Sequence, residues 1–219
     1  ACLGTTVSVI ALLSNQVLAT DIKTANPDLM IRFDNTLTYS TMYRLSDQDA
    51  DLIANLNADD GDRNFDKGVV MNRMDLLSLF DISYKKFGVA FSGAAWYDTI
   101  YNKTNDNDSP VTVNHDITEV AYNDFVDETV KWHGKGAELL EAMTFGTVPM
   151  GNMAFRYRAG QFSQWWGDSF FLGWNGVAGA LAPVNVAKAA TLPSVQLKEL
   201  IMPIPQVAGS LQVTDNLSF

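Results

Sequence analysis

Polar and apolar residues alternate with a period of two along several segments of this chain. In residues 31–44, IRFDNTLTYSTMYR, the odd-numbered positions are mostly apolar or aromatic and the even-numbered positions are mostly polar. Such a period places successive side chains on opposite faces of a strand. The same alternation predicts strands over 73–84, 87–101, 138–147, 153–163 and 205–214, and a seventh strand that begins at 217. In 138–147 the pattern places Leu139, Glu141, Met143 and Phe145 on one face.

Short turns and long connections separate these strands. The sequences KKFG at 85–88 and VPMGN at 148–152 fit tight turns, whereas 47–66, 102–136 and 165–204 form long loops. Short turns on one side and long loops on the other are typical of a transmembrane β-barrel. The predicted fold class is therefore all-β, an antiparallel transmembrane β-barrel in the outer membrane of a Gram-negative bacterium.

The charged face of each strand is expected to line the lumen. An arginine on the lipid face costs roughly 2–4 kcal/mol near the bilayer midplane, so Arg156 and Arg158 should point inward. Tyrosines near the strand ends suit the membrane–water boundary. The residues predicted to line the lumen or to bind a ligand are Arg32, Asp34, Arg73, Asp75, Trp96, Arg156, Arg158, Trp165 and Trp166.

The number of strands indicates an incomplete barrel. Single-chain barrels have about eight strands or more, and an open sheet edge cannot face lipid because its backbone groups would be unpaired. We therefore expect residues 20–219 to be the N-terminal part of a longer barrel domain. A soluble secreted β-sandwich is the alternative, because its strands alternate in the same way.

The first nineteen residues differ in kind from the rest. Residues 3–18 are apolar and small, and Val17-Leu18-Ala19 fits a signal-peptidase site. Residues 1–19 are therefore predicted to be a secretory signal peptide; an N-terminal strand or a buried helix is the alternative. Cys2, the only cysteine, lies inside this segment, so the exported chain would have no thiol.

Charge and hydropathy exclude two classes of protein. The formal net charge is −10 and the isoelectric point is about 4.5, which excludes nucleic acid as a partner. The mean hydropathy is −0.01, so any membrane-spanning elements must be strands rather than helices. No cofactor is predicted.

Five stretches together resemble a known family. They are NADDGDRNFDKG at 57–68, GKGAELLEAMTFG at 134–146, FRYRAGQFSQWWGDSFF at 155–171, APVNV at 182–186 and LKELIMPIPQVAGSLQVTDNLSF at 197–219. The set resembles the proteobacterial outer-membrane β-barrel family called domain of unknown function 1302. The resemblance implies a large barrel, of which this chain is the N-terminal part. It also implies a role in transport across the envelope, with hydrophobic compounds among the transported molecules.

Two polar loops contain candidate chemistry. Asp60, Asp62 and Asn64 have the spacing of the first three ligands of a calcium loop, but Phe65 replaces the glycine and Met71 the terminal glutamate. A solvated acidic loop is therefore favoured over a metal site. His115 and His133 are the only histidines, and no nucleophile motif accompanies the pair His115-Asp116. The chain is not predicted to be an enzyme.

The third long loop, 165–204, begins with an aromatic segment that includes Trp165, Trp166 and Trp174. It is too apolar and too long for a simple solvated connection. We expect it to fold into the lumen as a constriction; packing on the rim or against lipopolysaccharide is the alternative.

The predicted function is that of a channel or ligand-binding transporter for small solutes, gated or constricted by the 165–204 loop. The alternatives are a plugged structural or assembly barrel and, less favoured, a barrel hydrolase. The expected partners are outer-membrane lipid and lipopolysaccharide, the barrel assembly machinery, and a small-molecule solute that the sequence does not identify.

Overall fold

The computed structural model describes residues 14–55, 59–111, 120–164, 181–192, 195–214 and 217–219. Its elements are β1 (Ser14–Ile22), β2 (Leu29–Arg44), α1 (Ala50–Ile53), α2 (Asp60–Arg63), β3 (Gly68–Tyr84), β4 (Phe87–Asp98), α4 (Asp127–Thr129), the π-helix η1 (Val130–Gly134), β5 (Lys135–Met150), β6 (Met153–Phe162), α6 (Val186–Thr191), α7 (Leu197–Leu200), β7 (Ile204–Thr214) and β8 (Leu217–Ser218).

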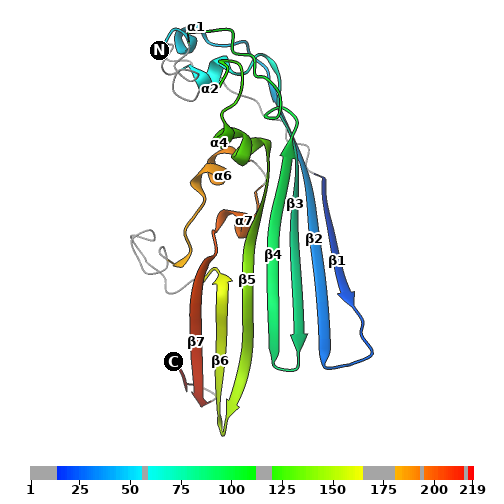
Figure 1. The fold of residues 1–219 in the computed structure, drawn as a ribbon. Coiled ribbons are helices and arrows are strands. Elements are labelled where there is room, and N and C mark those ends of the chain that lie inside the picture. The colour runs from blue at the N-terminus through cyan, green and yellow to red at the C-terminus, as the bar shows by residue number, and fades with distance from the viewer. Residues whose placement is uncertain (1–13, 56–58, 112–119, 165–180, 193–194, 215–216) are drawn as a thin grey trace. The chain divides into compact units, whose positions relative to one another are not determined.

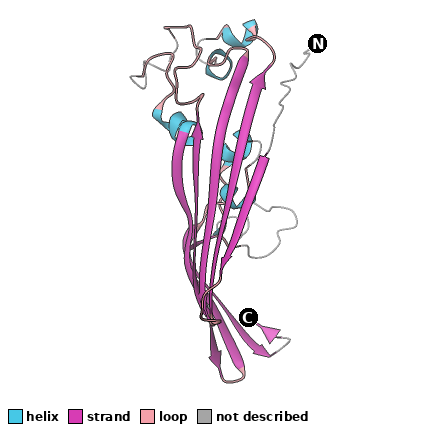
Figure 2. Cartoon of the chain, turned by 90° about the vertical axis from the view of Figure 1, so that its right-hand side faces the viewer, coloured by secondary structure: helices cyan, strands magenta, loops and turns pink. Residues whose placement is uncertain are grey.

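The strands form one antiparallel sheet in the order β1 to β8, so each strand pairs with its neighbour along the chain (Figure 1). In the described part of the chain β1 and β8 do not pair with each other, and the sheet is open. The helices are short and lie in the connections between strands (Figure 2). The sheet confirms the predicted all-β antiparallel fold class and fits an incomplete barrel, while the location in an outer membrane stays a prediction.

All the predicted strands are present, with changed limits, and one strand was not predicted. β3 begins at Gly68 and is therefore longer at its start than the alternation indicated. β5 is longer at both ends, since it begins at Lys135 and continues to Met150. The turn after β5 is Gly151-Asn152, where Gly151 has a φ of 67°. The additional strand, β1, includes residues 14–19 of the predicted signal peptide. Removal of 1–19 remains a prediction.

The chain divides into two compact units. Unit 1 comprises residues 1–15, 37–75 and 95–137, and unit 2 comprises 16–36, 76–94 and 138–219. Strands β1 to β5 therefore each contribute residues to both units. Unit 1 contains the connections 45–67 and 99–134, and unit 2 contains the short turns and the connection 163–203.

The short turns of unit 2 are hydrogen-bonded to neighbouring hairpins. Lys85, in the two-residue turn between β3 and β4, has a φ of 54°, and its N–H donates to the carbonyl of Asp28 (2.9 Å). The N–H of Thr147 in β5 donates to the carbonyl of Lys86 (2.9 Å). These bonds fix the stagger of adjacent hairpins at the turns.

Contacts between strands define two faces of the sheet. The inner face carries Leu77, Ala94 and Leu140, which pack together as a buried cluster. The outer face carries Phe33 and Phe80, whose rings meet edge to face at 6.0 Å. The alternation of side chains then assigns the other residues of these strands to a face. The inner face contains the even-numbered residues of β2, β4 and β6 and the odd-numbered residues of β3.

Strand β5 changes parity along its length, which a strict period of two did not predict. In its first part Leu140 is buried with the inner cluster and Leu139 is exposed. In its second part Phe145 is paired with Arg158 and Gly146 with Tyr157, so odd-numbered residues are inner. The change falls between Leu140 and Met143. An extra residue in one strand, called a β-bulge, produces a change of this kind. The prediction that Leu139 and Phe145 share a face is therefore wrong.

Candidate functional site

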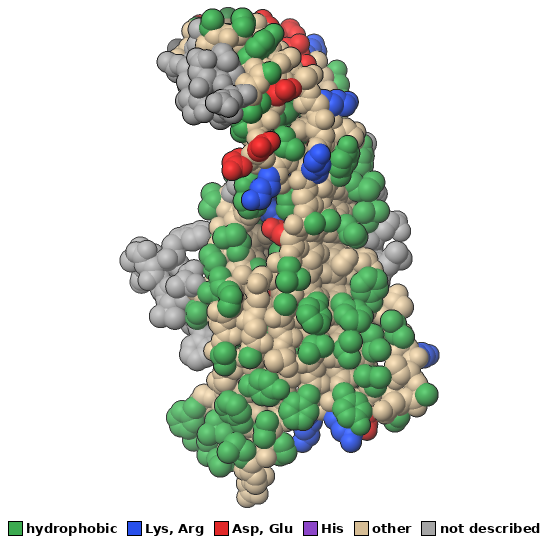
Figure 3. All heavy atoms as spheres, in the orientation of Figure 1, with side chains coloured by type: hydrophobic (Ala, Val, Ile, Leu, Met, Phe, Trp, Pro, Cys, Tyr) green, Lys and Arg blue, Asp and Glu red, His purple; other side chains and the backbone are tan. Residues whose placement is uncertain are grey.

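The outer face of the sheet exposes large apolar side chains, and the inner face buries polar side chains beside its apolar cluster. Polar inner-face side chains in β2 and β4 are buried, among them Ser40 and Ser92. Large apolar outer-face side chains are exposed, with Leu37 at 40% and Tyr97 at 52%. Figure 3 shows hydrophobic side chains spread over the strands on the face in view. Monomeric water-soluble proteins rarely expose large contiguous apolar patches, whereas lipid-facing strands do.

Two aspartates each neutralise an arginine two residues earlier on the inner face. In unit 2, Arg32 and Asp34 of β2 form an ion pair of 2.7 Å. In unit 1, Arg73 and Asp75 of β3 form an ion pair of 2.7 Å. Residues i and i+2 of a strand point to the same side, so the sequence Arg-x-Asp is sufficient to make these pairs.

Arg73 is held from several directions and is 1% exposed. Its Nη1 donates to the carbonyl of His133 (3.0 Å), and its guanidinium lies over the ring of Trp96 at 5.5 Å. Trp96 Nε1 in turn donates to the carbonyl of Lys131 (3.2 Å). Arg73 and Trp96 therefore attach the η1 segment to the inner face. Their predicted face is the one observed, but their polar groups are engaged within the protein rather than open to a solute.

His133 belongs to an aromatic cluster in unit 1. Its ring lies 5.2 Å from that of Tyr101, which lies 4.9 Å from Phe125. Burial lowers the pKa of His133, and the nearby charge of Arg73 lowers it further. Burial also raises the pKa of the Tyr101 hydroxyl. His133 is thus a half-buried member of this cluster, while His115 lies outside the described residues.

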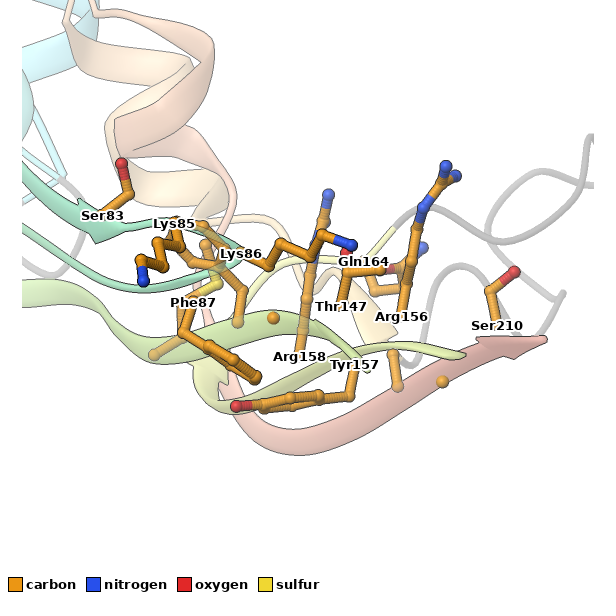
Figure 4. Close-up of a pocket in the computed structure, with 15 residues that line it drawn as sticks. Ser83, Lys85, Lys86, Phe87, Thr147, Arg156, Tyr157, Arg158, Gln164 and Ser210 are labelled. Carbon is orange, nitrogen blue, oxygen red and sulfur yellow. The ribbon is translucent and has the colours of Figure 1, made fainter. Parts of the chain in front are cut away.

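The arginines of β6 lack the acidic neighbour that Arg32 and Arg73 have. Arg156 and Arg158 are two residues apart on the inner face, and Figure 4 shows both side chains pointing to the same side as Lys86, away from Phe87 and Tyr157. Among the described residues, no carboxylate lies within ion-pair distance of these three cations; Arg156 donates only to Gln212 Oε1 (3.3 Å). They border an open cavity of about 760 Å³.

The acidic loop of unit 1 is cross-linked by two arginines. Arg44 pairs with Asp62 (2.5 Å), and Arg63 pairs with Asp59 (2.5 Å) and Asp108 (2.6 Å). The bonds to Asp59 and Asp108 raise the pKa of Arg63. The described part of the loop is therefore cross-linked by ion pairs, while Asp47, Asp51 and Asp66 are exposed as the sequence suggested.

The candidate metal ligands of this loop are used in other ways. Asp62 Oδ2 accepts from the N–H of Asp49 (2.8 Å), in addition to the ion pair of Oδ1. Asn64 Oδ1 accepts from Asn107 Nδ2 (3.0 Å), and Asp60 lies in the short helix α2. Within the described ranges no three His, Cys, Asp or Glu side chains are grouped as metal ligands would be.

The second half of the long loop of unit 2 is a compact lobe attached to β5. Its two ends meet at a bridge between Val184 and Ile201, and the N–H of Met202 donates to the carbonyl of Pro183 (2.7 Å). Lys188 in α6 is 3% exposed and forms an ion pair with Glu138 on the inner face of β5. Trp165 and Trp166 of the same loop lie outside the described residues.

Sequence reasoning missed the Lys188–Glu138 pair and the attachment of η1 to Arg73 and Trp96. Both join residues far apart in the sequence, so no local spacing could have shown them. The difference between Arg-x-Asp and Arg-x-Arg, in contrast, is a local signal that could have separated the paired arginines from those of β6.

These features define a class: an all-β protein whose open antiparallel sheet fits part of a β-barrel. The chain belongs to the family described as "Protein of unknown function (DUF1302)", whose family model matches residues 1–219. No curated protein and no solved structure matches the chain. None of the helices in the described ranges combines the length and the apolar character needed to cross a bilayer.

Proposed function

We propose that this chain is part of an outer-membrane channel or ligand-binding transporter for small solutes, hydrophobic ones included. The observation that carries the proposal is that the sheet exposes large apolar side chains on its outer face and buries polar side chains on its inner face. Buried polar side chains such as Thr36, Thr38 and Ser40 occupy the inner face of β2, and exposed apolar side chains such as Leu37 occupy the outer face. Lipid on one side and a polar interior on the other account for both.

The ordered part of the long loop supports a constricted interior. Glu138 belongs to the inner face, because it shares that face with Leu140 of the buried cluster. Lys188 binds Glu138 and so holds α6 against this face. A loop held in this way narrows the space that a solute can use. The first part of the loop, with Trp165 and Trp166, is proposed to extend the same constriction.

Lipid and lipopolysaccharide are the proposed partners of the outer face, and the barrel assembly machinery is the proposed insertion partner. The proposed location is the Gram-negative outer membrane. Residues 1–19 would direct export as a signal peptide and would then be removed. These proposals rest on the exposed aromatic and aliphatic residues of the outer face and on the apolar N-terminal sequence.

A plugged structural barrel is the second candidate. The observation in its favour is that Arg73 and Trp96 are both engaged by the η1 segment. Charges used in this way stabilise the interior and do not guide a solute.

Conductance distinguishes the two candidates. The full-length protein is reconstituted in planar bilayers and compared with the double variant Glu138→Gln/Lys188→Met, which removes both charges together. Lys198→Met is the matched control, because Lys198 lies in the same lobe in α7 and is exposed. A transporter with a constricting loop should show a higher conductance in the double variant and no change in the control. Absence of conductance in both, with intact folding, would favour the plugged barrel.

A further inference from the structure

Four inner-face arginines, Arg32, Arg73, Arg156 and Arg158, fall into two groups that differ in the residue two positions further along the strand. For Arg32 and Arg73 that residue is an aspartate, which neutralises the arginine. In β6 the corresponding sequence is Arg156-Tyr157-Arg158, which places a second cation where the aspartate would be. Two like charges on adjacent same-face positions repel each other unless an anion lies between or beside them.

The neighbouring strands supply no such anion. Arg156 is paired with Thr147 of β5 and Ser210 of β7, and Arg158 with Phe145 and Ala208. These are the positions closest to each arginine across the sheet. Lys86, in the turn before β4, adds a third cation from the other side of the cavity (Figure 4). This cationic cluster belongs to a chain whose formal net charge is −10.

The surroundings of the cluster are partly apolar. Met143 and Phe145 line the same cavity, and the Phe145 ring covers Gly88 so closely that a Cβ there would come within 2.4 Å of it. Ser83 and Gln164 also border the cavity and add polar groups. Charged donors next to an apolar wall match a molecule that has an anionic end and an apolar body.

We infer that Lys86, Arg156 and Arg158 bind the oxyanion group, carboxylate or phosphate, of an amphipathic solute. The inference deepens the proposed function, since it names the chemical class of the solute at the turn end of the inner face. Guanidinium groups bind either oxyanion through paired N–H donors, and Lys86 adds a point charge. The apolar body of the solute rests against Met143 and Phe145.

Calorimetric titration of the full-length protein, folded in a zwitterionic detergent, tests this site without any need for conductance. The probes are octanoate, octyl phosphate, inorganic phosphate and octylammonium. At least one of the two amphipathic anions should bind about tenfold or more tightly than octylammonium, which has the same chain length and the opposite charge. The preferred anion identifies the oxyanion.

The variant Arg156→Gln/Arg158→Gln should lose about tenfold or more of this affinity. Lys85→Gln is the matched control: Lys85 also borders the cavity, but it faces Asp28 at 3.8 Å and should change the affinity by less than about twofold. Unchanged heat-modifiable mobility shows that each variant is folded. If the double variant does not fold, the comparison of octanoate and octyl phosphate with octylammonium on the wild-type protein decides.

Three results would overturn the inference. They are equal binding of octylammonium and the anions, equal anion affinity in the folded double variant and the wild type, and binding of inorganic phosphate as tight as that of the preferred amphipathic anion. A protein that conducts no ions but binds octanoate through these arginines would contradict the proposed channel and leave the site intact.

Discussion

The roles of Arg32, Arg73, Arg156 and Arg158 on the inner face depend on the residue two positions further along the strand. An aspartate there makes a neutral pair, as at Arg32 and Arg73, and a second arginine leaves a net charge, as in β6. Burial then separates the two neutral pairs. The side chain of Arg32 is 57% exposed, whereas that of Arg73 is 2% exposed and also binds backbone carbonyls.

Replacement of Arg73 should therefore cost far more stability than replacement of Arg32. Arg73→Met leaves Asp75 without its partner in a buried site, and we expect a loss of about 3 kcal/mol in the free energy of unfolding. Arg32→Met removes an exposed pair and should cost about 1 kcal/mol or less. Denaturant unfolding of the full-length protein in detergent measures both. Equal losses would show that the η1 contacts of Arg73 add nothing.

Accessibility of single cysteines tests the assignment of faces in β6. Cysteine at 156 or 158 should react with a water-soluble maleimide, because both positions are inner. Cysteine at 155 or 157 should instead react with a lipid-phase probe, because Phe155 and Tyr157 are on the outer face with Phe87. Cys2, the only cysteine in the sequence, lies in the predicted signal peptide and is replaced by serine if that segment is retained. The reverse labelling pattern would place the arginines toward lipid and contradict the proposed lumen.

At the scale of the element, the strands were predictable and their irregularities were not. A period of two is a local signal, so β2, β3, β4, β6 and β7 could be predicted from the sequence alone. The parity change in β5 depends on how Gln161 binds the carbonyls of both Leu139 (3.2 Å) and Leu140 (2.8 Å), a contact from the next strand. The attachments of α6 and η1 likewise depend on distant residues.

The η1 segment should open more readily in acid. In the folded chain the pKa of His133 lies below the ordinary histidine value of 6.5, since burial disfavours its charged form. Between the folded pKa and about 6.5 the unfolded segment therefore binds a proton that the folded one does not, and stability falls as the pH falls through this window. Below the folded pKa, the stability that neutral His133 contributes is lost completely.

Tryptic cleavage after Lys131 measures this opening, because Lys131 lies within η1 and is exposed. We expect faster cleavage of the folded full-length protein near a pH of about 5.5 than near about 7.5, after correction for the activity of the protease on an unfolded reference. In His133→Gln the difference should shrink, because glutamine does not titrate. An unchanged pH dependence in this variant would assign the effect to other groups.

At the scale of the whole molecule, residues 14–19 in the N-terminal region have two competing interpretations. The structure places Ser14–Ile22 in strand β1, and the sequence predicts cleavage after Ala19. If the signal peptide is removed, most of β1 is lost and β2 becomes the first long strand.

Mass spectrometry of the protein exported to the outer membrane decides this point. We expect Thr20 at the N-terminus, because Val17-Leu18-Ala19 has small residues at the positions that signal peptidase reads. Replacing Ala19 by a bulky residue such as Leu should block processing. A membrane-inserted protein that retains residues 14–19 would show instead that β1 is part of the working barrel.

The sequential strand order has a consequence for how the protein assembles. Because β2 to β7 each pair with the preceding and the following strand, almost all backbone pairing is between segments close in the chain. Bringing such segments together costs little loop-closure entropy, so hairpins can form one after another at rates set by local contacts. The one pairing that must join distant segments is the seam that would close a complete barrel. Seam formation should therefore be the slow step of folding, and a catalyst of insertion would act there.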